Sequence, residues 1–408
     1  MSRLRSAVAF GAAILVTGVF SGLLGGSVTW LVRAVQHLAY GYDQGPLVAG
    51  VIAASTERRI LGPAIGCALA GLGWWLLRRT TSIPALDDSI RVGRPLPFIA
   101  LVGDALLQVL AVGSGASLGR EQAPRMLAAV GTELFIRTGS IPPAQRRMLL
   151  GGAAGAGLAA VYNVPAAGAL FACGIVLRTW RPQAILVAAA TSSIATVTVW
   201  PLTQGAPTFG WPATYFNSES VLLALAVIPV GAVVGGVFLW LTERAKPPIT
   251  PASWKLVATV GLAGLTTGAA STWLPQLPGN GKSIVLESLD GAGPMVALAL
   301  AVVLKPVLTA LFLRAGAVGG MITPALSTGT AAGALIATTV NHFGGHASIP
   351  IMALAGGAAM LGVTQKAPLF AAVFTAELTH PPVQMYGVLL VVAMGAHVAG
   401  RLIRRRAR

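Results

Sequence analysis

Eleven apolar stretches follow one another along this chain, separated by short segments that hold most of its charge. They lie near residues 8–32, 48–77, 97–113, 148–177, 183–201, 220–242, 254–274, 294–313, 329–340, 349–378 and 385–403. A helix needs roughly 20 consecutive apolar residues to cross a bilayer, so some stretches can cross and others are too short or too broken. The succession predicts an all-α, polytopic membrane protein.

Composition excludes a soluble fold. Only 10% of the residues are charged and 55% are hydrophobic, whereas a soluble globular protein carries about 25% charged residues. The 50 glycines suit the close helix contacts that membranes favour, and the 26 prolines predict interrupted helices. We therefore expect broken and re-entrant helices, with the lipid bilayer as the surrounding medium.

The excess of positive charge lies between the apolar stretches and at the two ends of the chain. The net charge of +16 comes from 28 Lys and Arg residues against 12 Asp and Glu residues. Arginines stand at positions 3, 5, 58, 59, 78, 79, 146 and 147 and throughout the tail after residue 400. This distribution follows the positive-inside rule. It predicts a multi-pass protein of the cell (plasma or inner) membrane with cytoplasmic termini, and it argues against a nucleic-acid partner.

The two halves of the chain carry similar motifs in the same order. Gly119-Arg120-Glu121-Gln122-Ala123-Pro124 corresponds to Gly319-Gly320-Met321-Ile322-Thr323-Pro324, and the two prolines are 200 residues apart. Asn163-Val164-Pro165 corresponds to Lys366-Ala367-Pro368, at a spacing of 203 residues. Interrupted segments in matching places are typical of repeat-built transporters. We expect one transmembrane domain over 1–408, with repeat halves at roughly 1–200 and 201–408 and no soluble regulatory domain.

Three segments combine Gly, Ser or Thr with a proline that suits the first turn of a helix. They are Thr80–Pro84, Gly113–Pro124 and Gly316–Pro324. A helix that begins inside the membrane directs free N–H groups and a partial positive charge at whatever lies before it. Several such ends that converge would hold a dehydrated anion without a full positive charge beside it.

These motifs resemble those of the CLC chloride channel and transporter family, in a short, prokaryotic-type member without CBS domains. Gly119-Arg120-Glu121 with Pro124 resembles the GREGP motif, and Gly320 to Pro324 resembles GxFxP. Further matches follow in family order: Thr80-Thr81-Ser82-Ile83-Pro84 as a degenerate GSGIP, Asn163 to Gly168 as N-x-P-x-x-G, Leu277 to Lys282, and Ala367-Pro368-Leu369 with Glu377-Leu378-Thr379. The resemblance implies an inverted-repeat homodimer with one pathway for chloride or a similar small anion in each subunit.

The resemblance also implies roles for particular residues. Glu121 matches the gating glutamate, whose carboxylate competes with chloride for the pathway. The backbone amides of Met321 and Ile322 match the central anion site, and Thr81 supplies a hydroxyl where the family has a serine. The remaining anion-binding candidates are Gly119, Arg120 and Gly320, from the same two motifs.

Departures from the family pattern leave the proton coupling open. Ile175 stands where many family exchangers have a proton-relaying carboxylate, and the chain stops at Arg408, where a tyrosine donor is expected. These features favour weak or absent coupling, hence channel-like or slipping anion flow; a strictly coupled proton/chloride antiporter stays the alternative. The extra residue before Pro124 predicts a small shift of the helix start relative to Glu121.

Other interpretations are weaker. Glu121 could pair with Arg120 or Arg125, and Thr81 could cap a helix. Asp87, Asp104 and Glu377 are expected to be structural, Cys67 and Cys173 to be buried free thiols, and His342 and His346 to lie in a loop without a metal. No cofactor is implied. An intramembrane enzyme would need a catalytic pair that is absent, and a cation-coupled carrier would need several buried carboxylates.

Overall fold

The computed structural model describes residues 2–137, 141–212, 214, 218–247, 252–291 and 293–406. Throughout this part of the chain the regular elements are the helices α1 to α18 and one π-helical segment, η1. The only β pairing in it is a single isolated bridge. The prediction of an all-α fold with broken helices is confirmed. The chain forms two compact units, each built from several stretches of sequence.

Unit 1 comprises Met1–Leu31, Thr80–Leu106 and Glu121–Thr208. Its helices are the first part of α1 (Ser2–Tyr40), α4 (Leu86–Val92), the first part of α5 (Phe98–Ser114), α6 (Gln122–Ile136), α7 (Pro143–Tyr162), α8 (Pro165–Phe171), η1 (Ala172–Leu177) and α9 (Pro182–Thr203). Small residues let α7 lie backbone to backbone against α6, because a Cβ on Gly157 would come within 2.5 Å of the Pro124 carbonyl oxygen. The glycines of α7 therefore position the first turn of α6.

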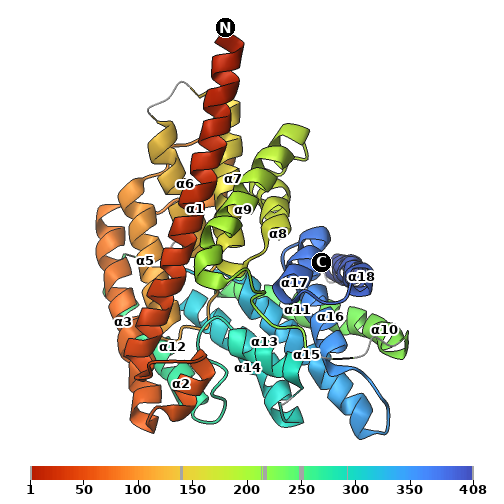
Figure 1. Ribbon diagram of the computed structural model, residues 1–408. Coiled ribbons are helices and arrows are strands. Elements are labelled where there is room, and N and C mark those ends of the chain that lie inside the picture. Colours follow the sequence, from red (N-terminus) through yellow and green to blue (C-terminus); the bar gives the residue numbers. More distant parts are fainter. Residues whose placement is uncertain are drawn as a thin grey trace. The chain divides into compact units, whose positions relative to one another are not determined.

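Unit 2 comprises Val32–Arg79, Leu107–Arg120 and Phe209–Arg408. Its further helices are α2 (Leu47–Ala53), α3 (Thr56–Thr80), α10 (Ser218–Leu225), α11 (Val227–Ala245), α12 (Lys255–Ser271), α13 (Lys282–Asp290), α14 (Met295–Arg314), α15 (Ile322–His342), α16 (Ile349–Thr364), α17 (Pro368–Thr379) and α18 (Gln384–Arg406). The centre of this unit is the α15–α16 pair, shown in the two lighter blues in Figure 1.

Glycine makes the α15–α16 contact possible. A Cβ on Gly333 would overlap the Met352 carbonyl oxygen, and one on Gly356 would overlap the carbonyl of Gly329. Residue numbers rise along α15 as they fall along α16, so the two helices are antiparallel at this contact. Close backbone approach of this kind is how helices pack without a hydrophobic driving force between them.

Two of the apolar stretches are broken at matching places. Asn163 (φ 57°) ends α7 and Lys366 (φ 55°) follows α16, both in the left-handed region. The next residues are also alike: Val164 has φ −131° and ψ 69°, and Ala367 has φ −138° and ψ 76°. In each case a proline then begins the following helix. The two motifs therefore correspond in backbone conformation as well as in sequence, as a repeat-built fold requires.

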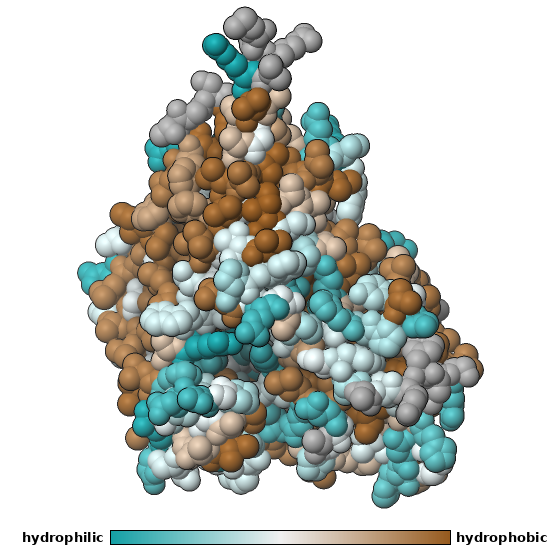
Figure 2. All heavy atoms as spheres, viewed as in Figure 1, coloured by the Kyte–Doolittle hydropathy of each residue, from teal (hydrophilic) through white to brown (hydrophobic). Residues whose placement is uncertain are grey.

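Among the residues that the structure describes, six helices are long and apolar enough to cross a membrane. They are Arg5–Tyr40, Thr56–Thr80, Pro182–Thr203, Glu219–Ala245, Met295–Arg314 and Gln384–Arg405. Their outward faces are apolar; on α1, for example, Leu23 and Trp30 are 55% and 68% exposed, and Figure 2 shows brown, apolar side chains gathered over this helix. The chain is a multi-pass membrane protein, with shorter apolar helices such as Phe98–Ser114 and Ile349–Thr364 between the long ones.

The α15–α16 contact makes a prediction about stability. Gly333→Ala should destabilise the protein by about 1–3 kcal/mol, because the added methyl group overpacks a backbone contact. Gly236→Ala, on α11, is the matched control: a Cβ there meets nothing within 4 Å, so the better helix propensity of alanine should raise stability by about 0.5–1 kcal/mol. Thermal unfolding of the detergent-solubilised variants measures both. Equal melting temperatures for the two variants would contradict the close approach of the α15 and α16 backbones.

Candidate anion-binding site

Two loops that carry corresponding motifs are joined by backbone hydrogen bonds within unit 2. The Gly119 N–H donates to the Gly320 carbonyl oxygen over 2.7 Å, and the Gly320 N–H donates to the Gly119 oxygen over 2.9 Å. This reciprocal pair is the isolated antiparallel bridge. The glycines predicted from two motifs 200 residues apart in sequence are therefore in direct contact.

The chain enters each of these loops through the same turn. Gly115 (φ 119°) follows α5 and Gly316 (φ 93°) follows α14. In both cases the next backbone N–H donates a hydrogen bond to a carbonyl oxygen of the preceding helix. Ala116 donates to Ala111 over 2.9 Å, and Ala317 donates to Phe312 over 3.0 Å. This is the glycine-terminated helix end that satisfies the last carbonyl groups. Helix α14 is also tied to the first loop, since the Thr309 hydroxyl donates to the Ser117 carbonyl oxygen over 2.9 Å.

The helices that leave the loops also begin alike. Glu121 is the N-cap residue of α6 and Met321 that of α15, so Pro124 and Pro324 are both the third helical residue. The two motifs of this chain therefore place their prolines alike, and the shift expected relative to the family motif stays a prediction. Ile322 is buried at the start of α15. The first N–H groups of such helices have no acceptor within the helix and carry its partial positive charge.

The third proline segment differs from the other two. Helix α4 begins at Leu86 with Ala85 as its N-cap, so Pro84 lies outside the helix and its predicted place in the first turn was wrong. Asp87 and Asp88 occupy that turn instead, where carboxylates are favoured by the helix dipole. Thr81 is half-buried in the loop of unit 1 that leads to α4, and it is not the residue that caps this helix.

Glu121 is buried, with 1% of its surface exposed, and it lies against the end of α7. The Tyr162 hydroxyl donates to its Oε2 atom over 3.4 Å. Tyr162 is itself buried, and its carbonyl oxygen accepts a 2.6 Å hydrogen bond from the Thr208 hydroxyl. The sequence analysis did not select Tyr162, although its place directly before the Asn163 motif was a usable signal.

The turn after Tyr162 is fixed by the side chain of Asn163. Its amide nitrogen donates to the carbonyl oxygens of Gly205 and Ala206, each over 2.9 Å. Its amide oxygen accepts a 3.1 Å hydrogen bond from the indole N–H of Trp200. These bonds explain why the motif has an asparagine there, a residue that also tolerates the left-handed conformation.

A buried guanidinium lies one turn further along α6. Arg125 forms an ion pair with Asp87 of α4, and its Cζ atom lies 4.3 Å from the centre of the Phe171 ring. Asp87 thus forms an ion pair within unit 1, in agreement with its interpretation as a structural residue. Phe171 directly precedes η1, which contains the half-buried Ile175. The sequence analysis missed this cluster because no motif links α4, α6 and η1.

A buried ammonium holds the loop before α13 in unit 2. The Nζ atom of Lys305 has no exposed surface and donates to the Leu277 and Gly279 carbonyl oxygens over 3.0 Å and 2.6 Å. The Gly279 N–H in turn donates to the Gly115 carbonyl oxygen over 3.0 Å. The loop over 277–281 is therefore fixed to the loop that precedes Gly119.

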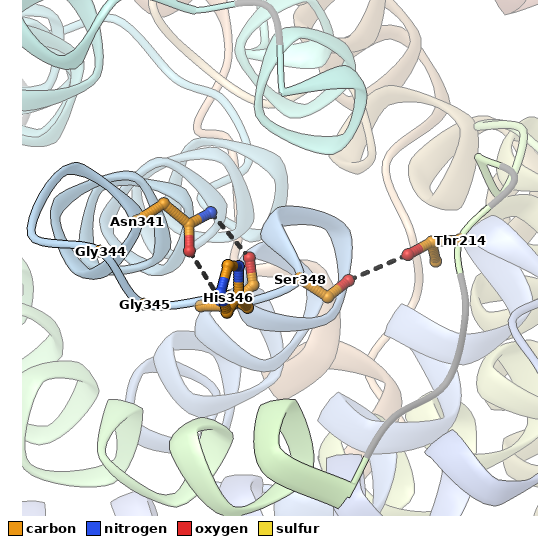
Figure 3. A pocket seen from close by; sticks show the side chains of 7 residues that line it. Thr214, Asn341, Gly344, Gly345, His346 and Ser348 are labelled. Carbon is orange, nitrogen blue, oxygen red and sulfur yellow. Dashed lines mark hydrogen bonds between the residues drawn. The ribbon is translucent and has the colours of Figure 1, made fainter.

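The remaining candidates lie on several other elements. Asp104 is buried on α5, Glu377 is half-buried on α17, and both cysteines are buried free thiols as predicted. His346 lines a hollow of about 540 Å³ at the α15–α16 turn, where Asn341 bonds to both backbone groups of Ala347 (Figure 3). The described residues contain no group of three or more His, Cys, Asp or Glu side chains placed to hold a metal ion.

Comparison with known families is consistent with this architecture. The family model described as voltage gated chloride channel matches residues 66–401. A protein of Ralstonia nicotianae named as a ClcB-like chloride channel protein is 32% identical over 377 residues, covering 85% of this chain and 83% of the relative. The voltage-gated ClC-type chloride channel ClcB of Salmonella typhimurium is 24% identical, covering 95% and 94% of the two chains. The chain belongs to the voltage-gated chloride channel (CLC) family.

Solved structures share the fold. A slow cyanobacterial Cl⁻/H⁺ antiporter superposes with a TM-score of 0.80 at 21% identity, covering 96% of this chain and 94% of the other. A CLC-type fluoride/proton antiporter superposes with a TM-score of 0.69 at 19% identity, covering 96% of both. These likenesses establish a CLC-type fold with broken and re-entrant helices.

The Tyr162 contact makes a prediction about pH. If Glu121 gates anion flow as the family resemblance implies, the Tyr162 hydroxyl favours its ionised form. Tyr162→Phe should then move the midpoint of the flux–pH curve upward. A hydrogen bond to a charged group contributes about 1.5–3 kcal/mol, and the 3.4 Å length points to the weak end, hence about one pH unit or less. Tyr42→Phe is the control, and identical midpoints for all three proteins would contradict the role of Tyr162.

Proposed function

We propose that this protein carries chloride or a similar small anion across a lipid bilayer, through a pathway gated by Glu121. The observation that carries the proposal is the reciprocal Gly119–Gly320 pair, which joins the loops that lead into α6 and α15. The residues at those two helix starts are Glu121 and Met321. Membership of the CLC family and the names of its relatives as chloride channels support the same substrate class.

The anion would be held mainly by backbone groups and helix dipoles. The amides of Met321 and Ile322 lie at the start of α15, where the partial positive charge of the helix is concentrated. Thr81 would add a hydroxyl donor, and Gly119, Arg120 and Gly320 would complete the set. Dipolar donors suit transport, because an anion must be bound strongly enough to enter and weakly enough to leave.

Glu121 would act as the gate because its carboxylate carries the same charge as the transported ion. A buried carboxylate at the start of a helix occupies a place that also attracts an anion. Protonation would remove the competing charge and open the pathway. An ionisable residue within an apolar segment is by default a functional candidate.

Proton coupling would be weak or absent. Ile175 has a hydrocarbon side chain that cannot relay protons, and it lies in η1, next to Phe171. The guanidinium of Arg125 over the Phe171 ring places a fixed positive charge there, which opposes the passage of protons. The counter-charge of Asp87 reduces this barrier. Coupled exchange is the second candidate, favoured by the structural likeness to a Cl⁻/H⁺ antiporter.

The protein would act as a homodimer in the cell membrane, with one pathway per subunit and both termini in the cytoplasm. The arginine-rich ends support this orientation. Transport, and not catalysis, is the activity proposed.

Neutral substitutions of Glu121 test the gate. Glu121→Gln and Glu121→Ala should mimic the protonated state, so anion flux into proteoliposomes should lose most of its pH dependence and stay near the low-pH wild-type value. Glu377→Gln, which changes a half-buried carboxylate on α17, serves as the control. A wild-type pH profile in both Glu121 variants would remove this residue as the gate.

Reversal potentials test the coupling. With equal chloride on both sides and a pH gradient across the membrane, an uncoupled pathway gives a reversal potential of zero. We expect a value at or near zero for the wild-type protein. A robust shift towards the proton equilibrium potential would show exchange, and the weak-coupling proposal would then be wrong.

A further inference from the structure

Three helix ends meet in unit 2, where α3 and α14 finish and α12 begins. A Cβ on Gly71 would come within 2.5 Å of the backbone of the first turn of α12, so the last part of α3 packs closely against that turn. The Thr259 hydroxyl of α12 donates to the Ala315 carbonyl oxygen, directly after α14, over 3.0 Å. The Arg78 guanidinium of α3 donates to the Gly316 carbonyl oxygen over 2.9 Å. These contacts fix the three ends beside one another.

Two of these ends belong to helices that are long and apolar enough to cross a membrane, α3 and α14. Each carries an exposed arginine in its last turn, Arg79 on α3 and Arg314 on α14. The preceding outward side chains are apolar, with Leu76 and Val307 50% and 45% exposed. Trp254, directly before α12, is 62% exposed, and tryptophan is enriched at the level of the lipid headgroups. The three ends therefore lie at the membrane surface.

A third exposed cation, Lys255, is the first residue of α12. This is the positive end of the helix, where a carboxylate is favoured and a cation is not. Along α3, α12 and α14 the only carboxylate is that of Glu57, at the opposite end of α3. Within the described part of the chain, none of Arg79, Lys255 and Arg314 forms an ion pair. An external anion would stabilise this group of charges.

The arginine at the opposite end of α3 is used differently. The Arg58 guanidinium donates to the carbonyl oxygens of Leu38 and Ala39, at the end of α1, over 2.8 Å and 3.2 Å. It thereby satisfies carbonyl groups that have no partner within their own helix. The Arg79 guanidinium lies over the Trp75 ring, with its Cζ atom 5.5 Å from the ring centre. Its N–H groups have no acceptor among the described residues, so they can bind an external group.

We propose that Arg79, Lys255 and Arg314 form a binding site for the headgroup of an anionic phospholipid. Arginine suits the planar, two-oxygen recognition of a phosphate group, and lysine adds a compact charge. Basic residues directly beside a membrane-crossing helix attract anionic lipids. The acyl chains lie along the exposed apolar side chains of the same helices, such as Leu262 on α12, which is 59% exposed. The partner is therefore a lipid with one apolar and one anionic part.

A bound headgroup has a structural consequence. By bridging Arg79 and Arg314 it holds the ends of α3 and α14 together, where Arg78 already bonds to Gly316. A ligand that binds the folded state and not the unfolded state raises stability. We therefore expect anionic lipid to stabilise this protein. Neither the binding nor the stabilisation depends on the proposed transport function.

Native mass spectrometry of the full chain in detergent micelles measures the binding. Phosphatidylglycerol is titrated, and phosphatidylcholine with the same acyl chains is the reference. One basic residue near a membrane surface contributes roughly fivefold to the affinity for anionic lipid. Arg79→Gln, Lys255→Gln and Arg314→Gln should each weaken the tightest phosphatidylglycerol binding about fivefold, and the triple variant should weaken it about a hundredfold. Binding of phosphatidylcholine should not change.

Two controls separate a defined site from general charge. A second triple variant, with Arg5→Gln, Arg401→Gln and Arg405→Gln, removes the same charge from exposed positions on α1 and α18. It should keep the tightest binding of phosphatidylglycerol. Lys255→Arg preserves the charge and should bind phosphatidylglycerol as the wild-type protein does.

Thermal unfolding in the same micelles tests the stabilisation. Phosphatidylglycerol should raise the melting temperature of the wild-type protein and of the α1/α18 triple variant above the value in phosphatidylcholine. The triple variant at Arg79, Lys255 and Arg314 should lose this increase.

Three outcomes would overturn the proposal. Wild-type binding in the variant that lacks Arg79, Lys255 and Arg314 would remove these residues from any lipid site. An equal loss in both triple variants would show a response to net charge and no defined site. Displacement of phosphatidylglycerol by an equal concentration of inorganic phosphate would show a site for free phosphate. All three are measured without anion flux, so the proposed transport function stands or fails separately.

Discussion

The reciprocal hydrogen bonds between Gly119 and Gly320 are the contact on which the arrangement of the candidate site depends. They join two loops that come from distant parts of the chain and that each lead directly into a helix. The pairing needs close backbone approach: a Cβ on the neighbouring Gly319 would lie 2.8 Å from the Leu118 Cβ atom. Glycine at position 319 is therefore a packing requirement, and the hydrogen-bonded pair beside it fixes the loop that leads into α15.

The buried cations of this protein are held in different ways, and the differences fit different roles. Arg125 has a carboxylate partner and an aromatic ring, so its charge is compensated within unit 1. Lys305 has two carbonyl partners and serves as a clamp on the loop before α13.

Local motifs predicted much of the fold, because the features they encode are local. Proline after Gly-rich turns predicted the starts of α6 and α15, and Asn163-Val164-Pro165 predicted a break that the backbone confirms. The same reasoning failed at Pro84, where Ala85 became the N-cap and the two aspartates that follow it occupied the first turn. The order of residues within one segment did not determine which of several neighbouring residues begins the helix.

The sequence by itself determined that the chain is a helical membrane protein with two sets of matching motifs. Apolar length, the shortage of charge and the spacing of prolines are properties of the chain before it folds. Only the tertiary structure decided which side chains meet. It brought Tyr162 to Glu121 and Asp87 to Arg125. These contacts depend on helix packing through small residues. The neighbouring residues in sequence do not determine the direction in which a side chain points once the helices have packed.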